Sequence, residues 1–505
     1  MSLRAAAALA RATLALALGG CATPEALYRA HLESRADRIR ECADWYRDID
    51  ARIDAAGVRD AQEARVAGFP YLRVSRLLAA LRPRAAADPL ALQALAERML
   101  LLDLDARRFE LRNLPLAPAE DSSHPLGLRA AMERTASCGR LLQEIDLARP
   151  ESRAALLARA EVPDDYARAH RILGLYALTR IPFAAGVRRH EAEVRAAFAR
   201  EPATPPGASV LRYDPPRLPR PMPRSRVSAI LAATSDNALG IPEPTEADLA
   251  ELFLAHAPSF EIEVVTDADR FGALRWLPRD LSPSVEGGAL AVYAHPAWTR
   301  YGGKVLLQLV YTIWFPERPP LAPDDLLAGR IDGVTWRVTL APDGEPLLYD
   351  SIHPCGCFHL FFPTPRALAR PAPGGLEEWA FAPQALPRIA EGERPLLRIA
   401  TRTHYIERVS VLRGANSLVR YDIRPYHELR SMQRMEGGRR SAFGADGLMP
   451  GTERPERHVF WPMGIRSAGA MRQWGRQATA FVGRRHFDDP DLLEKRFTLD
   501  LGRPQ

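Results

Sequence analysis

The sequence predicts an α+β fold, with an all-α helical N-terminal domain followed by a β-rich C-terminal domain. Ala, Leu, Arg and Glu, which are good helix formers, dominate residues 21–201. Eight prolines then fall within residues 202–223, and short apolar or alternating runs replace the helical pattern beyond them. We therefore expect a signal segment over 1–20, a helical domain over 21–201, a linker over 202–225 and a β-rich α+β domain over 226–505.

Four stretches of the N-terminal domain carry apolar residues at roughly helical intervals among charged ones. They are Leu27–Ile53, Leu90–Leu104, Leu126–Ile145 and Tyr166–Phe198. Prolines interrupt the pattern, because proline is excluded from helix interiors; these are Pro70, Pro89, Pro115, Pro125 and Pro163. The pattern predicts about six or seven helices, packed as a bundle or a short helical array.

The proline-rich segment and the residues after it differ in amino-acid pattern from the helical domain. Because proline fits neither a helix interior nor a central strand, residues 202–225 should form an extended, semi-rigid linker. Thr245 begins a short helix with a signal that resembles a capping box. Seven strands are then expected: Phe260–Val265, Ala289–Tyr293, Val305–Phe315, Val334–Leu340, Leu347–Ile352, Leu396–Thr401 and Tyr405–Leu412.

Three details refine this reading of the C-terminal domain. Val305–Phe315 is apolar on nearly both faces, as in a strand that is buried on both sides. Asp343-Gly344 predicts a hairpin between Val334–Leu340 and the next strand. Residues 432–457 are expected to be irregular, and Ala468–Arg485 is expected to form one or two short helices.

The formal net charge of +6 does not indicate nucleic-acid binding. Of the 68 basic residues, only Lys304 and Lys495 are lysines, a bias typical of a GC-rich genome. The 66 arginines are interleaved with 62 acidic residues and form no basic stripe. We therefore expect no nucleic-acid partner.

The N-terminus has the features of an export signal. Arg4 and Arg11 supply positive charge, and Ala12–Leu18 is a short apolar core, well below the ~20 residues that a membrane-spanning helix needs. The sequence Leu18-Gly19-Gly20-Cys21 resembles the lipobox of bacterial lipoproteins.

In that family the thiol of the cysteine receives a diacylglycerol, the signal is removed, and the new N-terminus is acylated. The resemblance implies a membrane anchor of acyl chains at Cys21, since several chains anchor durably where one does not. Ala22 follows, and a residue other than Asp at this position implies the outer membrane in Gram-negative members. We therefore expect a lipid-anchored envelope protein that faces the periplasm, with a protein of the envelope as a further partner.

Assigning Cys21 to lipid leaves four cysteines in an oxidising compartment. Two disulfides would use them all, and four cysteines allow three connectivities. The simplest pairs Cys42 with Cys138 inside the helical domain, and leaves Cys355 and Cys357 to each other or to another role.

The sharpest local feature is His353-Pro354-Cys355-Gly356-Cys357-Phe358-His359, in which four soft-metal ligands alternate with other residues. Thiolate and imidazole suit a copper or zinc ion. In a straight strand His353 and His359 would lie about 20 Å apart. A single metal therefore requires the chain to fold back at Pro354 or Gly356. The two candidates for ligands from elsewhere are His404 and His295.

Three other readings of this segment stay open. Cys355 and Cys357 could form a disulfide, whose tight ring would be readily reduced and hence a redox pair. Either cysteine could instead be a nucleophile that a histidine activates. The segment could also be a structural turn with buried cysteines. Two functions follow: an interaction or structural lipoprotein of the envelope, or a periplasmic metal-binding or redox protein centred on this segment.

Overall fold

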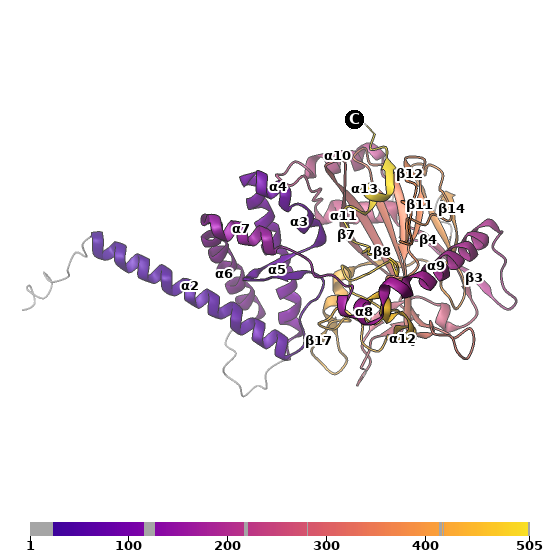
Figure 1. Ribbon diagram of the computed structural model, residues 1–505, viewed down its shortest axis with the longest axis horizontal. Helices are drawn as coiled ribbons and strands as arrows, with labels where there is room; N and C mark the ends of the chain where they lie inside the picture. The colour runs from indigo at the N-terminus through magenta and orange to yellow at the C-terminus, as the bar shows by residue number, and fades with distance from the viewer. Residues whose placement is uncertain are drawn as a thin grey trace, which may run out of the picture.

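The structure, a computed structural model, describes residues 24–115, 127–216, 221–279, 281–413, 417 and 419–502, with side chains from residue 35 onward. The signal segment and the lipobox cysteine Cys21 lie outside the described residues. The described part is a mixed α+β protein (Figure 1). Helices from the first part of the chain gather at one end, and the sheets lie at the other (Figure 1).

Three long helices form the framework of the helical end. They are α2 (Pro24–Ala55), α5 (Pro89–Asn113) and α6 (Leu128–Ala148), joined by the shorter α3 (Arg76–Ala80), α4 (Arg82–Ala87) and α7 (Pro150–Arg159). Their apolar faces meet in one core. A disulfide between Cys42 and Cys138 links α2 to α6, the pairing that the sequence analysis favoured.

The helical end is not all-α, contrary to the prediction. β1 (Ala64–Val66) and β2 (Phe69–Val74) form an antiparallel hairpin that packs on α5. The sequence of β2 is rich in aromatic and β-branched residues, which favour strands. Pro70 was assigned to a break between helices, whereas it lies inside this strand.

Two helices of the predicted helical domain pack against the β-rich end instead. α8 (Arg168–Leu173) contacts the loop at η3 (Trp461–Met463), and α9 (Tyr176–Ala199) contacts both η3 and β14. α9 continues through Pro182, which lies inside the helix in its second turn and removes the backbone hydrogen bond that would be donated to the Leu178 carbonyl. Figure 1 shows α9 lying across the sheets.

Two large sheets form most of the β-rich end. The larger has the order β11 (Leu360–Pro363), β10 (Pro346–Ile352), β9 (Gly329–Leu340), β8 (Lys304–Arg318), β7 (Ala291–Tyr301) and β15 (Asp422–Pro425). The smaller has the order β14 (Ile406–Arg413), β13 (Glu393–Ile399), β4 (Ser259–Val264) and β3 (Ser209–Tyr213). All seven predicted strands occur, and the hairpin at Asp343-Gly344 joins β9 to β10.

The sheets share one apolar core with α10 (Arg224–Thr234) and α11 (Glu246–His256). Thr245 caps α11 by accepting a hydrogen bond from the backbone N–H of Asp248. β3 lies within the predicted linker 202–225, which is therefore not merely a linker. Its five residues contain no proline, so they can pair with β4 at the sheet edge.

Segments near the C-terminus cover the other face of the larger sheet. This covering explains why residues 305–315 of β8 are buried on both faces, as the sequence predicts. Ala468–Arg485 forms turns rather than the expected helices. Gly469, Gly475 and Gly483 all have positive φ there, a conformation that ends a helix.

The remaining elements are short. They are η1 (Asp267–Asp269), β5 (Ala273–Arg275), β6 (Ser284–Glu286), β12 (Ala367–Ala369), η2 (Tyr426–Arg430), β16 (Met432–Gln433), β17 (Arg439–Arg440), α12 (Arg457–Phe460), α13 (Leu492–Arg496) and β18 (Phe497–Leu499). Among the described residues, no helix is both long and apolar enough to cross a membrane.

Buried polar contacts join the two ends of the molecule. Arg430 donates to Asp60 at 2.6 Å, and the Asn113 amide donates to the backbone carbonyl of Arg430 at 2.7 Å. Arg76 pairs with Asp165 at 2.9 Å and with Asp488 at 3.1 Å. These contacts hold the helical end in a defined position against the sheets.

Candidate functional site

The segment His353–His359 is the loop of the hairpin between β10 and β11, so the chain does fold back there. The His353 carbonyl accepts a hydrogen bond from the Gly356 N–H at 2.8 Å, with Pro354 at the second position of this turn, where its fixed φ fits. The His353 N–H in turn donates to the Cys357 carbonyl at 3.0 Å. The turn therefore presents its two cysteines at the end of the sheet.

Gly356 is required by its surroundings as well as by its conformation. Its φ is +96°, and a Cβ there would overlap the carbonyl oxygen of Ala478. The close approach brings the segment around Ala478 directly against the cysteine turn. Arg472 fixes the turn from another side by donating to the Cys355 carbonyl at 3.1 Å.

Cys355 and Cys357 are free thiols that interact with each other. The backbone N–H of Cys357 donates to Cys355 Sγ at 3.4 Å. A hydrogen bond from the Cys357 thiol lowers the pKa of Cys355, whereas the same contact, together with burial, raises the pKa of Cys357 well above its usual value. The pair therefore favours a thiolate at Cys355 that its neighbour stabilises.

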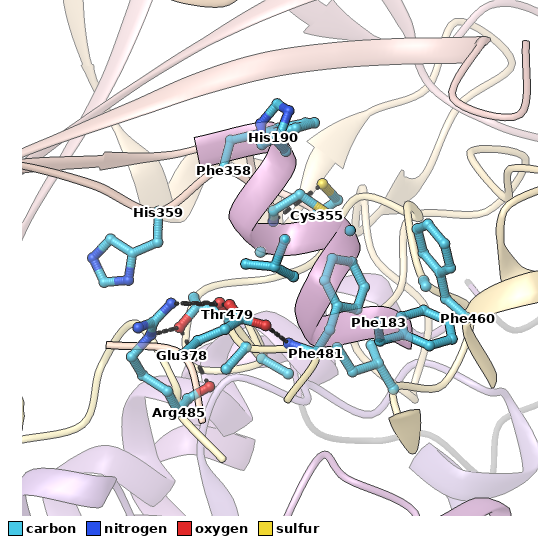
Figure 2. A pocket seen from close by; sticks show the side chains of 18 of the residues that line it. Phe183, His190, Cys355, Phe358, His359, Glu378, Phe460, Thr479, Phe481 and Arg485 are labelled. Atoms are coloured by element: carbon cyan, nitrogen blue, oxygen red, sulfur yellow. Dashed lines mark hydrogen bonds and ion pairs between the residues drawn. The ribbon is translucent and has the colours of Figure 1, made fainter. Parts of the chain in front are cut away.

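Both cysteines line a largely apolar cavity of about 480 Å³, a volume typical of small-molecule sites. α9 supplies one wall through Phe183, Val187 and His190, and the segment around Phe481 supplies another. Figure 2 shows Phe183, Phe460 and Phe481 grouped at one end, with Cys355 and Phe358 from the turn beside α9. The cavity offers aromatic surface next to a pair of free thiols.

Glu456 is the ionisable group of the cavity wall that bears most directly on the thiols. It is buried, and burial raises its pKa to about 7 despite the nearby charge of Arg454. Its negative charge raises the pKa of both cysteines. A carboxyl group that titrates near neutral pH beside two thiols can accept a thiol proton and return it.

His353 and His404 lie close together because both rings contact the same carboxylate, that of Asp332. His353 Nδ1 lies 3.1 Å from one Asp332 oxygen, and His404 Nδ1 lies 2.9 Å from the other. Arg454 also donates to Asp332, at 3.2 Å. Burial alone would raise the pKa of Asp332, yet these partners hold it well below its usual range. The cluster is a buried ionic network beneath the cysteine turn.

His359 points away from Cys355 (Figure 2). Its Nε2 lies 3.0 Å from Asp350, which also accepts two hydrogen bonds from Arg337. Burial lowers the pKa of His359 to about 3, so the ring is neutral. His359 therefore takes part in the buried polar contacts of the sheet and not in those of the cysteine pair.

His295 lies on β7, apart from the cysteine turn. Its ring packs against Tyr426 and Trp474, with centroid distances of 4.7 and 4.4 Å. Burial lowers its pKa to about 3. Within the described part of the chain, no group of three or more His, Cys, Asp or Glu side chains is arranged to hold a metal ion. The geometry therefore gives no support to a site built from all the predicted ligands.

Sequence reasoning found the cysteine turn but missed Glu456, Asp332 and the cavity wall from α9. Glu456 follows Cys357 by about a hundred residues and lies in a segment predicted to be irregular. No local spacing links these residues, because only the tertiary fold brings them together.

Comparisons with protein-family models, with curated proteins and with solved structures found no significant match to this chain.

Proposed function

We propose that this chain is a lipid-anchored protein of the bacterial cell envelope, as its resemblance to a lipobox at Leu18-Gly19-Gly20-Cys21 implies, and that its folded body carries out thiol–disulfide exchange through Cys355 and Cys357. The observation that carries the redox part is the contact between Cys355 Sγ and Cys357 in the wall of the apolar cavity.

The state of each sulfur supports this chemistry. Thiolates, not thiols, attack disulfides, and a lowered pKa increases the thiolate fraction. Cys355 is the cysteine with the lowered pKa, and Cys357 keeps its proton. The first therefore acts as the attacking group, and the second is placed to resolve the intermediate.

The exchange consumes one disulfide of a substrate and forms one in the protein. The Cys355 thiol first releases its proton to solvent, and the resulting thiolate attacks a substrate sulfur and forms a mixed disulfide. The other substrate sulfur leaves as a thiolate that takes up a proton from solvent, which balances the one that Cys355 released. Glu456 accepts the Cys357 proton, and Cys357 then attacks Cys355 Sγ. The second substrate sulfur leaves as a thiolate, which the proton on Glu456 neutralises. Two thiols of the protein thus become a disulfide while one substrate disulfide becomes two thiols.

Equilibration of the purified chain in glutathione buffers of stepped redox potential tests this function. Mass spectrometry after alkylation should show one two-electron transition that involves Cys355 and Cys357, while Cys42 and Cys138 stay paired. Cys355→Ser and Cys357→Ser should each abolish it. Two thiols that stay reduced at every ratio of glutathione disulfide to glutathione would overturn the proposal.

The anchor has its own test. Cells that are fed a labelled fatty acid should incorporate the label into the wild-type protein and not into Cys21→Ala. Fractionation should place the labelled protein in the outer membrane. An unlabelled wild-type protein in the soluble periplasm would contradict the anchor and leave the redox proposal standing.

A further inference from the structure

Five large apolar side chains are exposed close together where α8 meets α9. They are Ile172, Leu173, Leu175, Leu178 and Ile181, hereafter the α8–α9 patch. Leu173 and Leu178 are 75% and 64% exposed. Leu175, Leu178 and Ile181 follow one another at intervals of three residues, so they share one face of the helix start. Clustered exposed apolar residues of this kind mark an interaction surface.

The segment that carries the patch has only positive side chains among its charged residues. Residues 166–190 contain five arginines and no acidic residue, in a chain that has 62 acidic residues. Arg168, Arg188 and Arg189 are exposed, and within the described residues no ion pair joins them or Arg180 to a carboxylate. Apolar side chains flanked by exposed arginines complement a surface that is apolar inside and anionic at its boundary.

We infer that the α8–α9 patch docks onto an anionic phospholipid bilayer, with its leucine and isoleucine side chains inserted among the acyl chains and its arginines at the headgroups. Amphipathic helices with apolar residues on one side and arginine or lysine on the other bind membranes in this way. Juxtamembrane basic residues add attraction to anionic lipids. This contact goes beyond the lipid anchor, because it sets which face of the folded body meets the membrane.

The position of the patch also links the membrane to the cavity. Pro182 and Phe183, which follow Ile181 directly in α9, line the cavity that contains the cysteines. Figure 2 shows Phe183 projecting from α9 toward the cavity. Docking therefore places the cavity beside the bilayer surface.

Packing contacts hold the α8 part of this surface in place within the molecule. Ring contacts between His170 and Trp461, at 6.0 Å, tie α8 to η3, and Trp461 is itself 37% exposed. Gly174 approaches Pro462 so closely that a Cβ would clash with it. The patch is therefore a fixed surface that requires no rearrangement to bind.

Vesicle flotation with the chain from Ala22 to Gln505, which lacks the acylated cysteine, tests this docking independently of the anchor. Vesicles of phosphatidylglycerol and phosphatidylethanolamine should carry the protein, and vesicles of phosphatidylcholine should carry much less. Leu173→Gln/Leu178→Gln should reduce binding to the anionic vesicles by roughly tenfold or more. Leu368→Gln on β12, where Leu368 is 65% exposed, is the matched control and should bind as the wild type does.

Three results would overturn the inference. The first is equal binding by Leu173→Gln/Leu178→Gln and the control, and the second is no binding of the wild-type chain to anionic vesicles. The third is a dimer in solution that the double substitution dissociates, since the patch would then be covered by a second copy. Circular dichroism and thermal unfolding of each variant establish that it is folded.

Discussion

Gly469 lies directly against the carboxyl group of Glu456: a Cβ on Gly469 would overlap Oε1 of Glu456. Gly469 also has a φ of +83°, which favours glycine. The chain therefore leaves room for one carboxyl group at this position in the cavity wall. The predictions for Glu456 depend on this placement.

Glu456→Gln should speed the alkylation of the cysteines above pH 7. The carboxylate raises the pKa of both thiols, so its removal lowers both pKa values and increases the thiolate fraction. Iodoacetamide trapping followed by mass spectrometry across pH 6–9 measures the profile. Glu453→Gln, on the same segment, is the control. An unchanged profile for Glu456→Gln would remove Glu456 from the site.

The raised pKa of Glu456 should also make the stability of the protein depend on pH. Its pKa is about 7 in the folded protein, above the ~4.3 of an unfolded chain, so the folded state holds the proton more tightly. Its contribution to stability is complete below pH ~4.3 and is lost as pH rises through 7, by about 3 kcal/mol. Between pH 5 and pH 8 the free energy of unfolding, measured in urea, should decrease less for Glu456→Gln than for the wild type.

The parts of the fold that could be predicted from sequence depend on local patterns. The alternation in β9 and the apolar run in β8 identify strands, because side-chain burial imposes those periods directly. Pro354 and Gly356 likewise indicate that the chain folds back in the cysteine turn. These signals need no knowledge of distant residues.

The parts that could not be predicted depend on tertiary contacts. α9 has the pattern of a bundle helix, yet its apolar side covers a cavity in the β-rich end. His353 and His359 are buried, and each ring lies beside a carboxylate of the interior. The spacing of the histidines in the sequence gives no indication of these contacts. The position of Glu456 beside the thiols is of the same kind, because residues far apart in sequence create it.

Removal of the Cys42–Cys138 disulfide should destabilise the helical end. The bridge closes a loop of 96 residues between α2 and α6, and the loss of chain entropy in the unfolded state corresponds to about 4 to 5 kcal/mol. Cys42→Ala/Cys138→Ala should lower the urea midpoint accordingly. Retention of the Cys355 redox transition in this variant would show that the two cysteine pairs act independently.

Asp332→Asn should lower the free energy of unfolding more than the replacement of a surface carboxylate does. It would break the buried ion pair between Asp332 and Arg454, and removal of one partner of such a pair typically costs about 3 to 5 kcal/mol. Asp267→Asn removes a carboxylate from an exposed ion pair and should have little effect on stability, because solvent screens such a pair. Urea unfolding at pH 7 compares the two. Equal effects would contradict the network described around Asp332.

Chelation should leave the stability of the purified protein unchanged. His353 Nδ1 and His359 Nε2 already lie beside carboxylates, and the two rings serve different networks, so the four predicted ligands do not share one ion. Elemental analysis of anaerobically purified protein, with thermal unfolding before and after EDTA, measures this. The matched variant is Cys355→Ser/Cys357→Ser. About one equivalent of copper or zinc that this variant loses would favour the metal reading, because a single ion held by the sulfur pair would then replace thiol–disulfide exchange as the role of the turn.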